Sequence, residues 1–170
     1  MSIDLSSFHD ETIYSISIKE RIEEDSLDIN GRHITFIGPI KYEGHIYRSN
    51  RDKFIHININ YRYEEICGRC LEAFIDDRNV ILSGKLTNDI DKITLDEDDE
   101  IIYYKGDKLD LSDNIIDTVI LSLPMKPLCN EKCKGLCPKC GVNHNEEECN
   151  CAIEDIDPRL EKLKDFFLDE

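Results

Sequence analysis

Residues 54–70 read FIHININYRYEEICGRC, and this stretch decides the fold. Its first eight residues alternate between two sets of side chains, with Ile55, Ile57, Ile59 and Tyr61 at every second position, which is the pattern of a strand that buries one face. The turn Cys67-Gly68-Arg69-Cys70 interrupts this strand, and an extended pattern resumes over residues 71–85. The sequence therefore predicts two antiparallel strands joined at the cysteine turn.

Shorter strand patterns lie on both sides of this pair. Residues 13–18 alternate, residues 34–40 are strand-like but interrupted at Gly38-Pro39, and residues 101–104 form a third candidate. Gly44 is expected to mark a bend or turn. A sheet over about residues 11–104 follows from these patterns.

Two helices are predicted after the strands. Ser112 is the expected N-cap of the first, and Pro124 ends it because the residue before a proline avoids the helical region. The second is expected from Asp157-Pro158 onward, since proline suits the first helical position. Their apolar faces are Ile115, Ile116, Val119, Ile120 and Leu123 in the first helix, and Leu160, Leu163 and Phe167 in the second.

The fold class predicted from these elements is α+β, with an antiparallel, barrel-like sheet, a packed helix and a C-terminal zinc-knuckle segment. Residues 1–124 are expected to form the β-rich core with its one helix. Residues 125–152 form the cysteine-rich segment, and residues 153–170 form a terminal helix that packs on the core.

The eight cysteines indicate metal binding rather than disulfides. Residues 128–151 hold six of them and too few large apolar side chains to fold by hydrophobic burial alone. The first ten residues show no secretory signal, so we expect a cytoplasmic protein whose thiols stay reduced. Structural zinc contributes about 10–16 kcal/mol in small finger peptides, which is enough to order such a segment.

The cysteine spacing divides them into two candidate zinc sites. The turn Cys137-Pro138-Lys139-Cys140-Gly141 can aim two sulfurs at one metal, and Cys149 and Cys151 supply two more. A second site is expected from Cys67 and Cys70 with Cys129 and Cys133, if the first helix packs back on the sheet. This second pairing is an inference from topology.

Other chemistries are open to the same residues. His144 could replace one cysteine ligand, and four cysteines can also hold an iron–sulfur cluster. Cys67 and Cys70 resemble a thiol–disulfide motif, but the residues that follow look extended and provide no helix N-terminus to activate a thiol. Zinc held by four cysteines is favoured over these alternatives.

No catalytic signature accompanies the cysteines. The sequence contains no Gly-x-Ser-x-Gly, no glycine-rich phosphate loop and no His-Glu-x-x-His. A zinc ion with four cysteine ligands leaves no position for an activated water. We therefore expect a protein that is not an enzyme.

The net charge of -16 is opposed to nucleic-acid binding at long range, so any RNA contact requires a local basic patch. Residues 88–100 form an acidic run, interpreted as a solvated loop. One stretch, residues 124–140, is locally basic. The candidate RNA-binding residues are the four lysines of this stretch and the arginine of the Cys67–Cys70 turn, namely Lys126, Lys132, Lys134, Lys139 and Arg69. The same lysines could instead offset the negative charge of zinc thiolates.

Several motifs in this chain resemble the YceD family, the large ribosomal RNA subunit accumulation proteins. They are CGRCLE at residues 67–72, LDL at 109–111, LSLPMKPLC at 121–129, CKGLCPKCG at 133–141 with Asn143 and Asn145, and DPRL at 157–160. His144 stands where the family pattern has leucine. The resemblance implies a role in 23S rRNA accumulation, processing or large-subunit assembly, and no defined enzymatic activity.

Three functions follow as hypotheses. The first is a non-catalytic ribosome-biogenesis factor with structural zinc that binds 23S rRNA or a large-subunit ribosomal protein. The second is a protein-binding module that acts as a chaperone for a basic ribosomal protein. The third is a zinc–thiol redox switch. We expect no membrane and no small-molecule substrate as partner.

Overall fold

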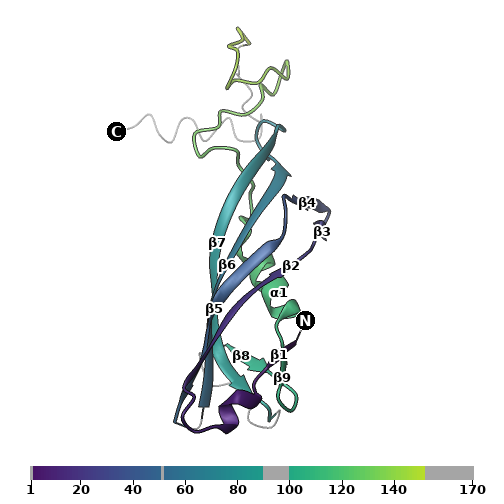
Figure 1. Ribbon diagram of the computed structural model, residues 1–170. Helices are drawn as coiled ribbons and strands as arrows, with labels where there is room; N and C mark the ends of the chain where they lie inside the picture. The colour runs from purple at the N-terminus through teal and green to yellow at the C-terminus, as the bar shows by residue number, and fades with distance from the viewer. Residues whose placement is uncertain (1, 51, 90–99, 152–170) are drawn as a thin grey trace, which may run out of the picture.

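The computed structural model describes residues 2–50, 52–89 and 100–151 (Figure 1). These residues form nine strands, one 3-10 helix and one α-helix. Their order is β1 (Ser2–Asp4), η1 (Ser6–His9), β2 (Ser15–Ile22), β3 (Ser26–Ile29), β4 (Arg32–Phe36), β5 (Ile40–Ser49), β6 (Asp52–Ile66), β7 (Ala73–Thr87), β8 (Ile101–Tyr103), β9 (Lys108–Asp110) and α1 (Ser112–Ser122).

The hairpin of β6 and β7 is the longest feature of the sheet. Each strand has 15 residues, and the antiparallel register runs from Lys53 opposite Leu86 to Ile66 opposite Ala73. Every second residue of β6 from Ile55 to Glu65 is buried. The prediction of two antiparallel strands joined at the cysteine turn is thus confirmed.

The other strands extend the sheet on both sides of this hairpin. Two strands pair with the edge of β6 that faces away from β7. β5 pairs with β6 from Asp52 to Asn60, and β4 pairs with β6 at Tyr63 and Glu64. β3 in turn pairs with β4. β2 lies beyond β5. β8 pairs with β7 in parallel, so the expectation of an antiparallel sheet is wrong at this pairing. Within the described residues β2 and β8 each pair with one strand only, and the sheet curls into an open half-barrel.

Helix α1 packs on the inner face of the half-barrel (Figure 1). Ile115 and Val119 are fully buried and belong to the same apolar cluster as the inward residues of β6. The hydroxyl of Tyr61 lies 2.7 Å from that of Ser122 at the end of the helix. The helix stops before Pro124, as predicted, with Leu123 extended.

Two local predictions are wrong. The helix N-cap is Leu111 instead of Ser112, and the Asp110 carboxylate accepts hydrogen bonds from the Ser112 amide and hydroxyl at 3.0 and 2.8 Å. Gly44 lies inside β5 opposite Ile57, where a Cβ atom would overlap the His56 carbonyl oxygen. Glycine at this position permits a close approach of two strands and makes no turn.

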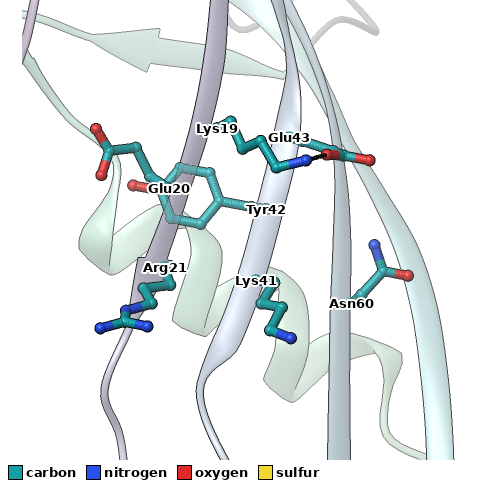
Figure 2. A pocket seen from close by; sticks show the side chains of 7 residues that line it. All are labelled: Lys19, Glu20, Arg21, Lys41, Tyr42, Glu43 and Asn60. Carbon is teal, nitrogen blue, oxygen red and sulfur yellow. Dashed lines mark ion pairs between the residues drawn. The ribbon is translucent and has the colours of Figure 1, made fainter.

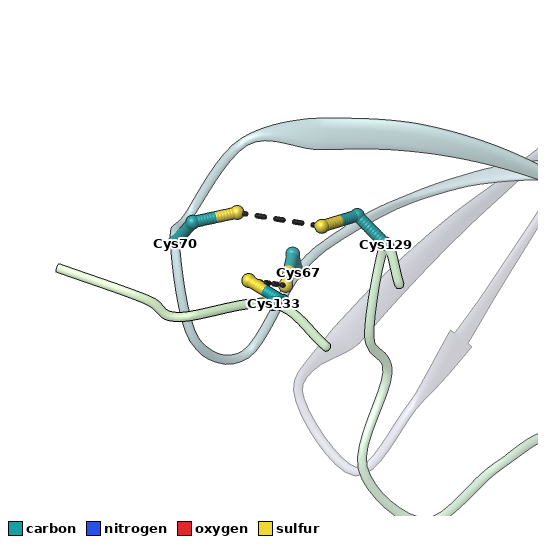
Figure 3. Close-up of side chains that lie close together, drawn as sticks. All are labelled: Cys67, Cys70, Cys129 and Cys133. Carbon is teal, nitrogen blue, oxygen red and sulfur yellow. Dashed lines mark hydrogen bonds between the residues drawn. The ribbon is translucent and has the colours of Figure 1, made fainter. Parts of the chain in front are cut away.

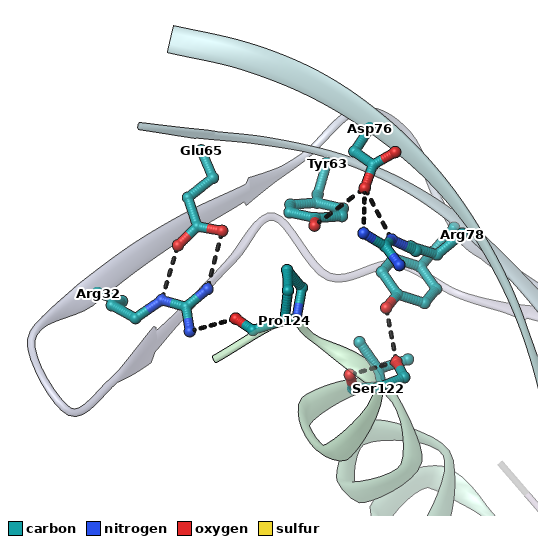
Figure 4. A network of polar contacts seen from close by, with 9 residues as sticks. Arg32, Tyr63, Glu65, Asp76, Arg78, Ser122 and Pro124 are labelled. Atoms are coloured by element: carbon teal, nitrogen blue, oxygen red, sulfur yellow. Dashed lines mark hydrogen bonds and ion pairs between the residues drawn. The ribbon is translucent and has the colours of Figure 1, made fainter. Parts of the chain in front are cut away.

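A polar network fixes the end of the sheet that carries the cysteine turn (Figure 4). Arg32 of β4 donates from Nε and Nη2 to the two carboxylate oxygens of Glu65, at 2.7 and 2.9 Å, and from Nη1 to the Pro124 carbonyl at 3.0 Å. The Glu65 side chain is only 4% exposed. The hydrogen bonds between Arg32 and the Glu65 carboxylate raise the pKa of the Arg32 guanidinium. One arginine therefore joins β4, β6 and the chain leaving α1.

In the described part of the chain, no helix has the length and apolar character needed to cross a membrane. The predicted terminal helix of residues 153–170 and most of the acidic run at 88–100 lie outside the described residues.

Candidate metal centres

The first cysteine group joins two segments that are far apart in the sequence. Cys67 and Cys70 lie in the turn between β6 and β7, while Cys129 and Cys133 lie in the segment after α1. Figure 3 shows the four side chains converging from these two segments. Their sulfur atoms all lie within 4.8 Å of one another. The structure thus brings together the two pairs that the topology argument placed side by side.

The spacing of these sulfur atoms fits a tetrahedral metal site. Cys67 Sγ lies 3.9 Å from Cys133 Sγ, and Cys70 Sγ lies 3.7 Å from Cys129 Sγ. A tetrahedron of sulfurs with Zn–S bonds of about 2.3 Å has edges of about 3.8 Å. The donor set and its spacing are therefore those of a closed four-thiolate centre, although the same ligands suit other thiophilic metals.

Backbone and side-chain amides around the first group favour thiolates. Burial raises the pKa of the Cys67 thiol, but the amides of Cys129, Cys70 and Arg69 outweigh this effect and lower it to about 6. Asn145 Nδ2 donates to Cys133 Sγ at 3.3 Å and lowers the pKa of that thiol. Such outer hydrogen bonds orient metal ligands and hold part of the group's charge.

Main-chain contacts attach the cysteine-rich segment to the hairpin turn. The Gly68 amide donates to the Pro127 carbonyl at 2.9 Å, and the Leu136 amide donates to the Arg69 carbonyl at 3.1 Å. Gly135 has φ +78° and packs so closely that a Cβ atom would lie 3.0 Å from the Arg69 carbonyl oxygen. The first group is thus a joint between the sheet and the segment.

The second group lies entirely within residues 137–151. The sulfur atoms of Cys137, Cys140, Cys149 and Cys151 also lie within 4.8 Å of one another, but Cys137 alone among them is buried. The amides of Cys140 and Lys139 lower the pKa of the Cys137 thiol to about 6. His144 Nε2 lies 4.0 Å from Cys149 Sγ, so the histidine borders the group as a fifth side chain.

The predicted RNA-binding residues are all exposed around these groups. Arg69 is partly committed to the fold, because its Nη1 donates to the carbonyls of Glu131 and Cys133 at 3.1 and 2.9 Å. Lys132 borders a hollow of about 400 Å³ beside the first group. Exposed acidic residues lie in the same segment, namely Glu131, Glu146, Glu147 and Glu148. The local positive charge of residues 124–140 is therefore balanced by the residues that follow.

Asn145 is the functional residue to which sequence reasoning assigned no role. Besides Cys133, it bonds the Lys134 amide through Oδ1 at 2.8 Å and the side chain of Asn143 at 2.7 Å. The available signal was the pair Asn143 and Asn145, which follows the turn of Cys137 and Cys140 and matches the family pattern. Its meaning depends on a fold that returns Asn145 to a cysteine 12 residues earlier.

Both groups have the chemistry of structural sites. Four cysteines in each would complete the tetrahedron of a bound metal ion and would leave no coordination position for a substrate or a catalytic water. What such a centre does is hold chain segments together, and at the first group these segments are the hairpin turn and the cysteine-rich segment.

Comparisons with known proteins give relatives of part of the chain. An uncharacterised protein of Mycobacterium tuberculosis is 38% identical over 100 residues, which cover 57% of this chain and 47% of the relative. The chloroplastic large ribosomal RNA subunit accumulation protein YCED homolog 1 of Arabidopsis thaliana is 40% identical over 50 residues, covering 29% of this chain and 16% of its own length. The homolog of the same name from Zea mays is 36% identical over 75 residues, covering 43% and 25%.

These relatives are longer proteins, and this chain spans about half the length of the mycobacterial ones. No solved structure matches the chain. The family model for the large ribosomal RNA subunit accumulation protein YceD matches residues 55–167, which include all eight cysteines, most of the β6–β7 hairpin and α1. The chain therefore belongs to the YceD family.

Proposed function

We propose that this protein is a non-catalytic factor that supports the accumulation of 23S rRNA during assembly of the large ribosomal subunit. Membership of a family named for large-subunit rRNA accumulation supports this function. The two cysteine groups support the non-catalytic part, because closed tetrahedral donor sets stabilise a scaffold and offer no reaction centre.

The observation that carries the proposal is the joint at the first cysteine group. It attaches a segment of poor hydrophobic content to the tip of a hairpin whose two strands have 15 residues each, and it buries three of its four cysteines in doing so. A metal-locked surface at the end of a rigid sheet suits recognition of a large partner rather than turnover of a small one. We assign zinc to both groups, since thiolate ligands in tetrahedral sets favour it.

Depletion of the protein in its own host tests the function directly. The expected result is a lower ratio of 23S to 16S rRNA, with recovery by the wild-type chain and not by a Cys67→Ser/Cys129→Ser variant. A Tyr103→Ser variant, changed at an exposed position in β8, is the control and should restore the ratio. An unchanged ratio after depletion would remove the proposal.

Metal content provides an independent measurement. Mass spectrometry under native conditions should find two zinc ions on each chain. Iron with a visible charge-transfer band would replace the zinc assignment with an iron–sulfur cluster.

Contacts to RNA near the metal groups remain part of the proposal. Lys126, Lys132, Lys134 and Lys139, together with Arg69, are the proposed residues there. Reversing the charge of Lys126 and Lys132 should weaken RNA binding and flatten its dependence on salt. Equal affinity of the variant and the wild type would withdraw these residues as contacts.

A chaperone for a basic ribosomal protein is the second candidate. It is favoured by large apolar side chains that stay exposed around the first group, including Ile66, Leu71 and Met125, which are 58%, 65% and 99% exposed. Such side chains suit contact with a protein. Co-purification of a large-subunit protein that survives RNase treatment would favour this candidate over direct RNA binding.

A further inference from the structure

The outer face of the sheet is open, in contrast to the inner face that α1 covers. Along β5 every second residue from Lys41 to Ser49 points outward and is exposed, and its partners on β6 have the same orientation. An open antiparallel sheet normally carries a scattering of charged side chains on this face. Here the outward residues of β5 and their partners on β6 include one lysine and two acidic residues, and the others are histidine, asparagine, serine or aromatic.

Two shallow hollows adjoin on this face, with volumes of about 620 and 390 Å³. They share Lys41 and Asn60, which are direct partners in the β5–β6 register. Figure 2 shows the larger hollow, where Lys19, Arg21 and Lys41 extend from two neighbouring strands. The smaller hollow lies where β5 leaves the edge of β6 and Ile37 takes over the pairing.

This region is less acidic than the chain as a whole. The residues that line the two hollows include five lysines and arginines against three acidic residues. The whole chain has 21 lysines and arginines against 37 aspartates and glutamates. Four of these five cations pair with carboxylates, namely Lys19 with Glu43, Arg21 with Glu23, Arg62 with Asp77 and Arg78 with Asp76. Lys41 makes no ion pair within the described residues, so it is the cation of this face that is open to a phosphate group.

Amide side chains lie next to the cations. Asn79 Nδ2 donates to Asn60 Oδ1 at 2.6 Å across the β6–β7 pair, and both side chains are exposed. Each retains a donor and an acceptor toward solvent, since an amide group offers two of each. Asparagine side chains of this kind can pair with the edges of unpaired bases.

An aromatic pair completes the face further along the same two strands. Tyr47 stacks on its cross-strand partner Phe54, with ring centroids 5.7 Å apart and planes at 21°, and Tyr47 is 42% exposed. Between this pair and Lys41 lie two rows, His45 opposite His56 and Glu43 opposite Asn58. Six residues of strand separate Tyr47 from Lys41, which is about 20 Å.

We propose that this face, from the Tyr47–Phe54 pair to the Lys41–Asn60 pair, binds a segment of single-stranded RNA. Aromatic side chains on an open sheet stack with unpaired bases, amides bond base edges, and cations hold the phosphates. Helical RNA fits less well, because its bases are stacked inside the duplex and out of reach of Tyr47. The inference rests on the proposed function and names the surface that would contact the rRNA.

Binding measurements on the full, zinc-loaded chain test this inference. The probe is a fluorescently labelled single-stranded RNA of mixed sequence, titrated by anisotropy at several salt concentrations. Lys41→Glu and Tyr47→Ser should each weaken binding several-fold. Lys41→Glu should also reduce the salt slope by about 0.7, the value of one lost phosphate contact on a single strand.

Lys105→Glu is the matched control, since it changes the net charge by the same amount at an exposed site in the loop between β8 and β9, outside the residues of the proposed face. It should leave affinity close to that of the wild type. Melting curves of all three variants confirm that each is folded. Lys41→Gln should lie between the wild type and Lys41→Glu.

Three outcomes overturn the inference. The first is equal affinity of Lys41→Glu, Tyr47→Ser and Lys105→Glu. The second is tighter binding of the corresponding duplex than of the single strand. The third is a wild-type chain that binds no RNA. None of these removes the proposed function if depletion still lowers 23S rRNA, because the protein could then act through a protein partner or, in the first two cases, through the lysines near the metal groups.

Discussion

The two cysteine groups use the same turn but are held by different parts of the chain. In each Cys-x-x-Cys turn, the residue after the second cysteine donates its amide to the carbonyl of the first, from Leu71 to Cys67 at 3.0 Å and from Gly141 to Cys137 at 2.9 Å. Both residues have a positive φ, 59° at Leu71 and 76° at Gly141. Only glycine adopts this conformation without cost.

The surroundings explain why one turn tolerates leucine. The first turn closes a hairpin whose strands pair as far as Ile66 and Ala73, so the sheet imposes its geometry. The second has no such support and depends on the local chain, with Cys137 bonded to the Val142 carbonyl. The comparison teaches that a metal centre can be fixed either by a pre-formed sheet or by its own ligands and a glycine.

Removing one ligand from each group is the strongest test of this difference. Cys67→Ser should abolish metal binding at the first group and lower the stability of the sheet by about 4 kcal/mol or more, as expected for loss of a buried metal ligand. Cys149→Ser should remove the second metal and leave the unfolding of the sheet nearly unchanged. Thermal denaturation with metal analysis measures both effects, and equal losses from the two variants would contradict the comparison.

The support beneath the first group can be removed without touching a cysteine. Arg32→Ala leaves the buried Glu65 carboxylate without its two hydrogen bonds, two residues before Cys67. Loss of one partner of a buried pair costs about 3–5 kcal/mol. Chemical denaturation should show this loss, and the first metal should be released at lower chelator concentration while the second is unaffected. Arg21→Ala, at an exposed ion pair, is the control and should change stability little.

Asn145 provides a smaller and more local test. Asn145→Ala removes the hydrogen bond to Cys133 Sγ and should weaken metal binding at the first group about 10–100-fold, as other outer-shell changes do. Competition with a zinc-binding dye gives this affinity. Although residue 145 lies within the sequence range of the second group, that group should retain its metal. Release of the second metal alone would show that the segment is organised differently.

The smallest effect distinguishes the two turns at a single position. Leu71→Gly should stabilise the protein by up to about 1 kcal/mol, because relief of the left-handed conformation exceeds the entropy that glycine adds to the unfolded chain. Gly141→Ala should destabilise the second group by about 1 kcal/mol for the same reason. Metal release from each variant at increasing denaturant concentration shows whether each substitution raises or lowers the stability of its group. Destabilisation by Leu71→Gly would mean that the leucine side chain contributes packing at this turn.

The sequence was sufficient for the features that depend on local pattern. The alternation over residues 54–61 identifies β6 because each inward side chain from Ile55 onward is buried against the same core. The parallel pairing of β8 with β7 left no local signal, since it depends on how residues after Thr87 return to the sheet. Gly44 was misread because a glycine that allows close strand contact looks the same in sequence as one that makes a turn.

Of the two cysteine groups, one could be predicted from local sequence and the other depended on the fold. Cys137 and Cys140 with Cys149 and Cys151 can be grouped by proximity in sequence. Cys70 and Cys129 are 59 residues apart, so their association required a topological argument. The outer sheet face with Lys41 and Asn60 could not be recognised in advance, because its residues come from four strands whose register is known only from the fold.

The long separation between the halves of the first group also has a consequence during synthesis. A ribosome adds about 5–20 residues per second, so roughly 3–12 s pass between the emergence of Cys70 and that of Cys129. During this interval the hairpin turn presents two thiols with half of their final coordination. The nascent chain can therefore hold a metal only loosely until its second pair arrives, and capture of that pair then joins the hairpin turn to the segment that follows α1.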